Sequence, residues 1–210
     1  MSLVLHDFEL DEGSYKARLL LAFLGLAYDR VPVDVFPGRE QDTPAFRALS
    51  PRGTLPVLVN GGLVLRDAEA ILAYLARRFD PRDQWLPADD PALFGEVMTW
   101  LSFAAGPLRA AAVARLHAMF ETPADMAAAI RGARGAFRDM EDHMTVREFD
   151  GGDWFVGRKP TIADVALFPA IALSRDAGIE HDAYPALRRW IRRFRGLPGF
   201  RTMPGVPDYY

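Results

Sequence analysis

The sequence predicts an α/β fold followed by an all-α fold within one chain. Between residues 1 and 80, short runs of strand-forming residues alternate with helical patterns, which is typical of a small sheet covered by helices. From residue 91 to residue 210 there is no convincing strand pattern, and long stretches rich in Ala, Leu and Arg have helical spacing. Residues 81–90, rich in Pro and Asp, are expected to link the two parts.

The expected elements of the first eighty residues follow the order β-α-β-α-β-β-α. We expect strands at Leu3–Leu5, Tyr28–Val35, Pro56–Val59 and Leu63–Leu65, and helices at 14–25, 43–49 and 67–79. Thr43 followed by Pro44 is a typical helix cap and first turn, and Asp67 is a good N-cap. A parallel β-α-β unit followed by a hairpin and a helix makes one small mixed sheet.

The second half is expected to be helical throughout. The helical stretches are residues 92–119, 123–147, 161–177 and 185–195. Gly106 followed by Pro107 interrupts the first of them, so we expect a kink or a break there. Thr161 and Asp164 form a predicted capping box with a structural role. The tail, residues 196–210, is dense in Gly and Pro and is expected to pack loosely.

Composition narrows the class of protein. The chain has 210 residues, a formal net charge of −3, half apolar residues and a quarter charged ones, which is ordinary for a soluble globular protein. The charge balance gives no reason to expect a nucleic-acid partner. No apolar run approaches the ~20 residues that span a bilayer, and the N-terminus lacks a secretory pattern. We therefore expect a cytoplasmic protein without a membrane partner.

The absence of cysteine limits the chemistry of any site. It excludes disulfides, zinc–cysteine sites and reactions of a protein thiol. The four histidines are scattered without the spacing of metal ligands, so we expect no metal site. If sulfur chemistry takes place here, a ligand must bring the sulfur.

Four segments of the chain stand out as motifs: Ser14–Leu19 (SYKARL), Ser50–Leu58 (SPRGTLPVL), Asp67–Ile71 (DAEAI) and Gly157–Val165 (GRKPTIADV). They occur in the order in which glutathione S-transferases have them, and the chain resembles that family over about residues 3–195. The resemblance implies a thioredoxin-like domain at residues 1–80 and a helical domain at 91–210. It also implies glutathione as co-substrate, no metal, a small hydrophobic electrophile as second substrate, and a homodimer.

Within this family, Pro56 matches a cis proline that precedes a strand. Leu55, just before it, would then present its own N–H and C=O to the cysteinyl backbone of glutathione, as an added strand does. The alternative is a proline that merely begins a strand.

The resemblance also implies two sites for the carboxylates of glutathione. The helix that begins at Asp67-Ala68 would hold the γ-glutamyl carboxylate at its N-terminus. The family usually has Glu-Ser there, and losing the hydroxyl of Ser costs about 0.5–1.5 kcal/mol of binding if nothing replaces it. Arg39 or Arg52, in the loops around the second helix, would bind the glycyl carboxylate, or would be solvated surface residues.

The hydroxyl that the family uses to ionise the glutathione thiol is missing. Asp11 stands at the position of the serine-type hydroxyl, and no tyrosine is present near Asp7-Phe8. An ionised Asp11 cannot donate a hydrogen bond to the thiolate, but it can cap the first helix. Ser14 is the remaining hydroxyl of this turn and the candidate catalytic residue, with Tyr15 as a weaker candidate.

Two functions fit these residues. The first is a glutathione S-transferase that adds the glutathione thiolate to a small electrophile, in detoxification. The second is a catalytically weak or inactive scaffold of the same family, which the changes at Asp11 and Ala68 favour. Candidates for the pocket of the second substrate, for each of which a place in the core is the favoured alternative, are Trp100, Phe103, Met119 and Phe120.

Overall fold

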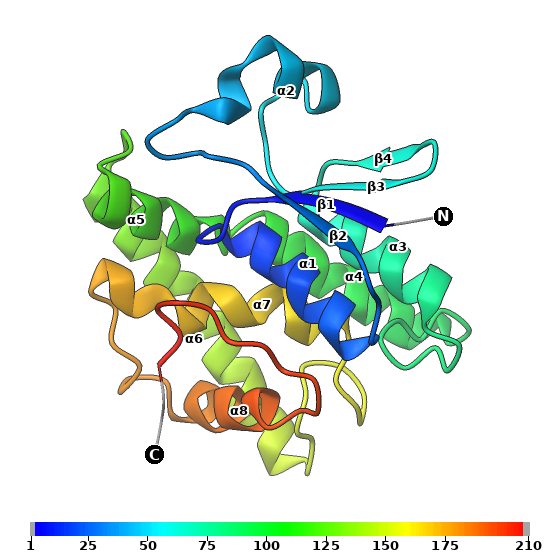
Figure 1. The fold of residues 1–210 in the computed structure, drawn as a ribbon. Helices are drawn as coiled ribbons and strands as arrows, with labels where there is room; N and C mark the ends of the chain where they lie inside the picture. Colours follow the sequence, from blue (N-terminus) through cyan, green and yellow to red (C-terminus); the bar gives the residue numbers. More distant parts are fainter. Residues whose placement is uncertain (1–2, 208–210) are drawn as a thin grey trace.

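The computed structural model describes residues 3–207, and Figure 1 shows a small sheet with its helices packed on a larger helical part. The strands are β1 (Leu3–Asp7), β2 (Asp29–Pro32), β3 (Val57–Asn60) and β4 (Leu63–Leu65). They lie in the order β2-β1-β3-β4. Strand β1 pairs parallel with β2 and antiparallel with β3, which pairs antiparallel with β4. The predicted mixed sheet is confirmed.

Helices cover both faces of the sheet (Figure 1), because the strands alternate their apolar side chains between the two faces. Helices α1 (Glu12–Phe23) and α3 (Ala68–Phe79) share the main core with Leu3 and Leu5 of β1. On the other face, Phe46 of helix α2 (Pro44–Leu49) forms a smaller core with Val33 and Val57. A short 3₁₀ helix, η1 (Glu40–Asp42), precedes α2.

Strand β2 is shorter than predicted. It has four residues instead of the eight expected at 28–35, and all four are exposed. The reason is that the neighbouring strand β1 ends at Asp7. The C=O of Asp7 accepts a hydrogen bond from Val33 N–H at 2.8 Å, and β1 has no further residue with which β2 could pair. The chain then leaves the sheet, and Val33 packs on Phe46 instead of continuing the strand.

The second half contains only helices among the described residues. They are α4 (Pro91–Ala105), α5 (Arg109–Phe120), α6 (Met126–Phe149), α7 (Ile162–Ala172), the 3₁₀ helix η2 (Ser174–Ala177) and α8 (Pro185–Arg195). The break expected at Gly106-Pro107 is confirmed, since it separates α4 from α5. The fold class predicted from the sequence is therefore correct.

Helix α7 is the centre of the helical part, and all eleven of its residues are buried. Its predicted capping box is present: Thr161 accepts from the first turn, and its N–H donates to Asp164 at 2.9 Å. The Asp164 carboxylate also accepts from Phe155 N–H at 3.2 Å and from Trp190 Nε1 at 2.9 Å. One buried carboxylate thus joins the start of α7 to α8 and to the preceding loop.

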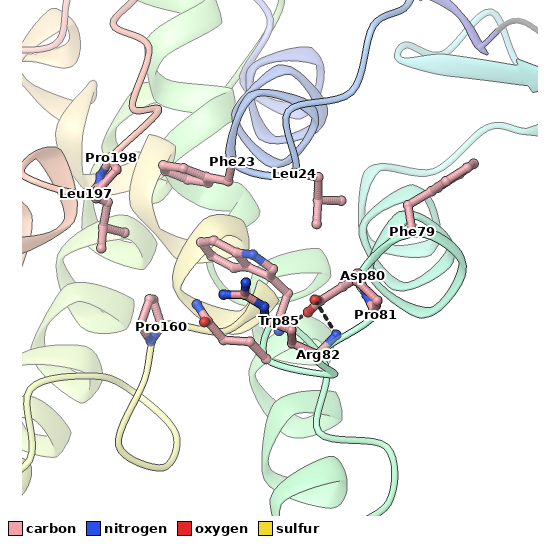
Figure 2. A pocket seen from close by; sticks show the side chains of 11 residues that line it. Phe23, Leu24, Phe79, Asp80, Pro81, Arg82, Trp85, Pro160, Leu197 and Pro198 are labelled. Atoms are coloured by element: carbon pink, nitrogen blue, oxygen red, sulfur yellow. Dashed lines mark hydrogen bonds between the residues drawn. The ribbon is translucent and has the colours of Figure 1, made fainter.

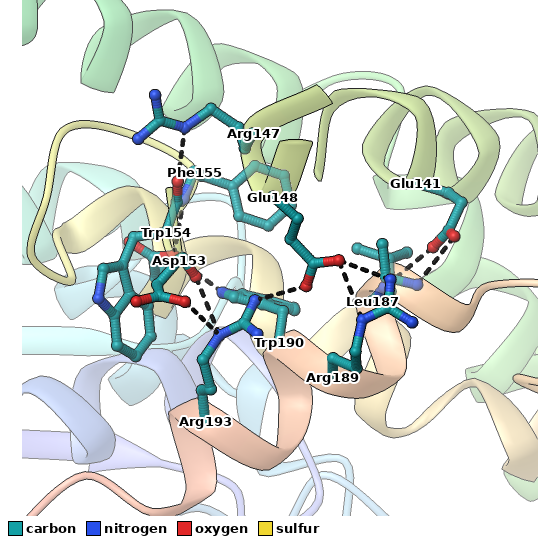
Figure 3. A network of polar contacts seen from close by, with 12 residues as sticks. Glu141, Arg147, Glu148, Asp153, Trp154, Phe155, Leu187, Arg189, Trp190 and Arg193 are labelled. Atoms are coloured by element: carbon teal, nitrogen blue, oxygen red, sulfur yellow. Dashed lines mark hydrogen bonds and ion pairs between the residues drawn. The ribbon is translucent and has the colours of Figure 1, made fainter. Parts of the chain in front are cut away.

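Carboxylates of α6 hold α8 in place (Figure 3). Helix α8 has no side-chain cap of its own, and Glu141 instead accepts from the N–H groups of Ala186 and Leu187, both at 2.9 Å. About two helical turns further along α6, Glu148 pairs with Arg189 at 2.5 Å. These contacts fix the outer layer of the helical part.

The C-terminal tail is anchored at a few points, although most of its residues up to 207 are exposed as expected for loose packing, and residues 208–210 lie outside the described part. The Tyr15 hydroxyl donates to the C=O of Arg201 at 2.6 Å, and Met203 is buried. Phe200 lies edge-on to Phe194 and Phe168. The tail therefore forms part of the core beside α1.

The expected linker, residues 81–90, is partly buried. Its Trp85 and Leu86 reach the core, and the Asp80 carboxylate accepts from the N–H groups of Arg82 at 3.0 Å and Trp85 at 2.8 Å. The division of the chain at residues 80 and 91 stays a prediction. After the linker, the stretch Pro91–Phe120 is long and apolar enough by composition to cross a membrane, and 33% of its most apolar window is buried inside the structure.

Candidate functional site

A cavity of about 250 Å³ lies where the sheet-bearing part meets α4 and α5. Its walls come from the first turn of α1, the loop before β3, the start of α3 and one face of α4–α5. The lining from the first three of these segments includes Asp11, Glu12, Gly13, Leu55, Asp67 and Ala68. Four segments that are distant in the sequence therefore converge on one small space.

Gly13 allows this convergence. A Cβ added at Gly13 would lie 3.0 Å from Pro56 Cδ and 3.5 Å from Ala68 Cβ. The first contact is tighter than ordinary van der Waals packing against a rigid proline ring. The absence of a side chain at Gly13 thus brings the start of α1 against the loop before β3 and against the start of α3.

The first turn of α1 presents free backbone donors. Asp11 caps the helix, as one of the two sequence alternatives predicted, by accepting from Ser14 N–H at 2.5 Å. The N–H groups of Glu12 and Gly13 make no backbone hydrogen bond within residues 3–207. Free N–H groups and the helix dipole make such a turn attractive to an anion.

The first turn of α3 repeats this arrangement on the opposite wall. The predicted cap is present, because Asp67 accepts from Ala70 N–H at 3.0 Å. The N–H groups of Ala68 and Glu69 form no backbone bond with any described residue. The cavity therefore has two N-termini of twelve-residue helices in its walls.

Leu55 adds an open stretch of backbone. The Leu55–Pro56 peptide bond is cis, and the ladder of β3 with β1 begins only at Val57. Neither the N–H nor the C=O of Leu55 has a hydrogen-bond partner in the described part of the chain. An extended peptide can pair with these groups as a strand pairs with a sheet edge.

The cations near the cavity differ from those expected. Arg52 lines the cavity, but Arg39 does not, because it pairs with Asp42 at 2.8 Å and its side chain is 75% exposed. Arg66 and Arg109 also line it and were missed. Arg66 adjoins the α3 cap and was visible in the sequence, whereas Arg109 reaches the cavity only through the packing of α5.

A second, larger cavity of about 510 Å³ lies at the linker (Figure 2). Phe23 stacks on Trp85 there, with ring centroids 4.9 Å apart and planes 15° apart. Figure 2 shows its carboxylate, Asp80, already bonded to backbone N–H groups. Its lining residues include no helix N-terminus, since α1 and α3 both end beside it. The smaller cavity is therefore the candidate site.

No metal centre is evident among residues 3–207, where no group of three or more His, Asp or Glu side chains is placed to hold an ion. Acids of the small cavity are mostly engaged in other contacts. Asp11 and Asp67 cap helices, and Glu69 pairs with Lys16 across α1 and α3 at 2.7 Å.

Comparison with known proteins identifies the family. The model of the glutathione S-transferase N-terminal domain matches residues 14–78, and that of the C-terminal domain matches residues 108–193. A maleylacetoacetate isomerase of Pseudomonas aeruginosa is 30% identical, over 94% of this chain and 93% of that protein. The chain belongs to the glutathione S-transferase superfamily.

Solved structures agree with this membership. A glutathione S-transferase of Xanthobacter autotrophicus Py2 superposes with a TM-score of 0.85 at 28% identity, covering 98% of each chain. A homologue from Lodderomyces elongisporus, with two glutathione molecules per subunit, has a TM-score of 0.84 at 25% identity over 95% of each chain. These relatives support a glutathione-dependent transferase with glutathione as co-substrate.

The hydroxyls considered for this transferase lie away from the cavity lining. Ser14 is fully buried, and its Oγ accepts from Phe8 N–H at 3.4 Å. The Tyr15 hydroxyl donates to Arg201 on the far side of α1. The structure does not bring either hydroxyl to the cavity, and the assignment of thiol activation to Ser14 stays a prediction.

The expected pocket residues of the transferase's second substrate are also placed elsewhere. Trp100 and Phe103 pack against the core, and neither Met119 nor Phe120 lines the cavity. Phe120 instead stacks on Phe36 with centroids 4.3 Å apart, beside Phe8.

Glu12 is a functional candidate that sequence reasoning missed. It lines the cavity while only 9% exposed, and burial raises the pKa of its carboxyl to about 7, against the opposing effect of Arg115. An acid in the first turn of a helix is so ordinary that its sequence position gave no signal. Its burial depends on tertiary packing, in which α1 lies against α3 and α7 and Arg115 of α5 comes near Glu12, and the sequence pattern does not reveal this.

Proposed function

We propose that this transferase holds glutathione in the small cavity and adds its thiolate to a small hydrophobic electrophile. The convergence of two free helix N-termini and the unpaired backbone of Leu55 on one cavity supports this proposal most directly. A charged tripeptide needs an anion site, a backbone partner and a cation, and all three line this space.

Each part of glutathione has a partner in this arrangement. The γ-glutamyl carboxylate binds the free N–H groups of Ala68 and Glu69 behind the Asp67 cap. The cysteinyl backbone pairs with Leu55, ahead of Pro56. The glycyl carboxylate binds Arg52, which has no hydrogen bond or ion pair among the described residues.

Binding in this orientation brings the thiol to the first turn of α1, because Gly13 adjoins the Pro56 ring. The free N–H groups of this turn and the helix dipole favour the thiolate over the thiol. This turn takes the place of the usual hydroxyl. A role for Ser14 is tested by Ser14→Ala, which leaves conjugation unchanged if the backbone donors are sufficient.

The walls opposite the sulfur suit an apolar acceptor. Leu108, Ala112 and Leu116 of the helical part face the cavity, and Arg109 stands beside them. Apolar side chains bind the body of a small electrophile, and a guanidinium binds a carboxylate or another anionic group on it.

Isomerisation of an anionic substrate is a second candidate. The relative from Pseudomonas aeruginosa is named as a maleylacetoacetate isomerase, and Arg109 beside the cavity favours an acceptor with a carboxylate. The scaffold function is the third candidate, supported by the lack of a hydroxyl at Asp11 and Ala68.

Calorimetric titration with glutathione, followed by turnover assays with an aryl halide and with maleylacetoacetate, separates these functions. We expect glutathione binding and turnover of at least one electrophile. Binding without turnover of either substrate supports the scaffold, and an Asp11→Ser variant then tests whether a hydroxyl restores conjugation. A protein that binds no glutathione contradicts the proposal.

We also propose a homodimer in which the sheet-bearing part of one subunit packs on the helical part of the other. Exposed apolar side chains on both parts support it, since Leu63 of β4 is 39% exposed, and Phe94 and Met98 of α4 are 38% and 37% exposed. A monomer in sedimentation at assay concentrations contradicts it. A cytoplasmic location and a role in detoxification accompany this proposal and stay predictions.

A further inference from the structure

Glu12, the first residue of α1, is a carboxylate at the cavity without a partner. Its side chain is 9% exposed, and Oε1 is buried with no hydrogen-bond partner in the structure. Its backbone lies in the turn that packs on the loop before β3, beside Gly13. Burying a carboxylate oxygen without a hydrogen-bond partner lowers the stability of the folded state, so a functional reason for this residue is worth seeking.

The other acids of the cavity are already engaged. Asp11 and Asp67 accept from the backbone of their own helices, and Glu69 pairs with Lys16. Among the described residues that line the cavity, Glu12 alone is an acid for which no hydrogen bond or ion pair is formed. It is thus the carboxylate that is free to accept a proton from a ligand.

The groups around Glu12 come from three elements. Lys16 and Asp11 belong to α1 and its cap, Arg115 comes from α5 and Asp176 from η2. The two cations favour the carboxylate form of Glu12 and the two acids oppose it, while burial is the largest effect and favours the neutral form. The resulting pKa of Glu12, about 7, lies where a group can both take up and release protons at neutral pH.

Arg115 is held so that it can act on Glu12. It is almost fully buried, donates to Leu10 C=O at 2.5 Å, and pairs with Asp176 at 2.8 Å through Nε. Its second terminal nitrogen, Nη2, is buried and has no hydrogen-bond partner in the structure. A charge fixed in this way supplies a constant field and needs no rearrangement during a reaction.

We propose that Glu12 is a catalytic residue that takes the proton of the glutathione thiol, an inference that rests on the glutathione-binding function proposed above. The S–H bond breaks as the proton moves to the carboxylate of Glu12, and the electron pair left on sulfur forms the C–S bond to the electrophile. In a substitution the leaving group departs with its bonding pair and Glu12 releases the proton to solvent. In an addition to a double bond, Glu12 returns the proton to the carbanion.

Glu12→Gln tests this role, because it keeps the shape of the side chain and removes the proton acceptor. We expect kcat at pH 7 to fall by about 100-fold, within the range of general-base catalysis, and KM for glutathione to change little. The acid limb of the kcat/KM profile should move toward the free thiol pKa of ~8.5. Thiolate absorbance of the bound glutathione should move in the same direction.

The direction of that movement separates catalysis from a purely electrostatic role. If Glu12 were only a nearby negative charge, its removal would lower the pKa of the thiol and raise the rate at low pH. That outcome, or a kcat within threefold of the wild type, overturns the inference. Loss of glutathione binding without loss of kcat also overturns it, because Glu12 is then a binding residue.

Two further variants keep the test decisive. Glu12→Asp retains a carboxylate and should keep part of the rate and the original pH limb, even if Glu12→Gln folds poorly. Asp139→Asn, on the exposed face of α6, removes one negative charge outside the cavity lining and should leave the rate and the pH profile unchanged.

If the wild type binds no glutathione, the proposed function fails as well, whereas binding and turnover unaffected by Glu12→Gln contradict this inference alone.

Discussion

The first turns of α1 and α3 have similar sequences and caps, but their glutamates lie in different environments. Each follows an Asp cap, each has a Glu within its first two residues, and each leaves two N–H groups free at the same cavity. Glu69 of α3 is neutralised by Lys16, whereas Glu12 of α1 is buried with an unpartnered oxygen. The same local pattern therefore carries a proposed anion site in one helix and a proposed proton acceptor in the other, and tertiary contacts make the difference.

Breaking the pair between α1 and α3 should have the largest effect on stability. Lys16→Met leaves Glu69 charged in a site where both side chains are mostly buried, at 9% and 14% exposure. We expect a loss of roughly 3 kcal/mol in the free energy of unfolding, as for other buried pairs with one partner removed. Urea denaturation at pH 7 measures it, with the double variant Lys16→Met/Glu69→Gln as control. A double variant as unstable as the single one contradicts this reason.

Removing the charge of Glu12 in the first turn of α1 should instead increase the free energy of unfolding. The folded-state pKa of Glu12 is raised from 4.5 to about 7, so the folded protein holds more protons than the unfolded chain between these values. Stability therefore falls as pH rises through this window, and the penalty is complete above pH 7. Glu12→Gln should be more stable than the wild type by on the order of 1–3 kcal/mol at pH 8.

The same variant should gain nothing at pH 4, where Glu12 is protonated in the folded state and largely so in the unfolded chain. Denaturant titrations at both pH values measure the difference. An equal gain at pH 4 and pH 8 would show that packing, and not ionisation, is the cause.

Two arginines sharpen the comparison on the α3 side of the cavity. Arg52→Ala should weaken glutathione binding by about 1–2 kcal/mol, because the glycyl carboxylate loses a charged partner. Arg39→Ala should weaken it much less, since Arg39 pairs with Asp42 and does not line the cavity. Calorimetric titration of both variants compares their affinities for glutathione directly. An equal loss of affinity would indicate that Arg39 also takes part in binding.

A hydroxyl at the start of α3 should have the smallest effect. Ala68→Ser adds one donor to the two free N–H groups of this turn, and we expect glutathione to bind more tightly by about 0.5–1.5 kcal/mol. A calorimetric titration measures the gain, and weaker binding would indicate that the carboxylate lies elsewhere.

Local signals predicted much of the fold. The caps at Asp11, Asp67 and Thr161 and the break at Gly106 depend on residues within one turn, so the sequence shows them directly. The length of β2 was predicted wrongly, because it depends on where the neighbouring strand β1 ends.

The cavity was predicted best where the backbone forms it. Leu55 and Ala68 line it through main-chain position, and both were expected there. Side-chain direction and helix packing decide the rest: Ser14 Oγ accepts from Phe8 N–H, while Glu12 of α1 and Arg109 of α5 line one cavity that only the tertiary structure creates. A helical pattern indicates which face is buried, but it does not say which partner buries it.

The position of Arg115 has a consequence for how such an enzyme can change its specificity. On α5, Leu116 lines the cavity proposed to hold the acceptor, and its neighbour Arg115 acts electrostatically on Glu12, the proposed proton acceptor. Substitutions that widen this helix face for a bulkier molecule will therefore also retune the acidity at the sulfur. Substrate specificity and the reactivity of the thiol are therefore expected to change together in this chain. Directed evolution of acceptor specificity should be screened at more than one pH.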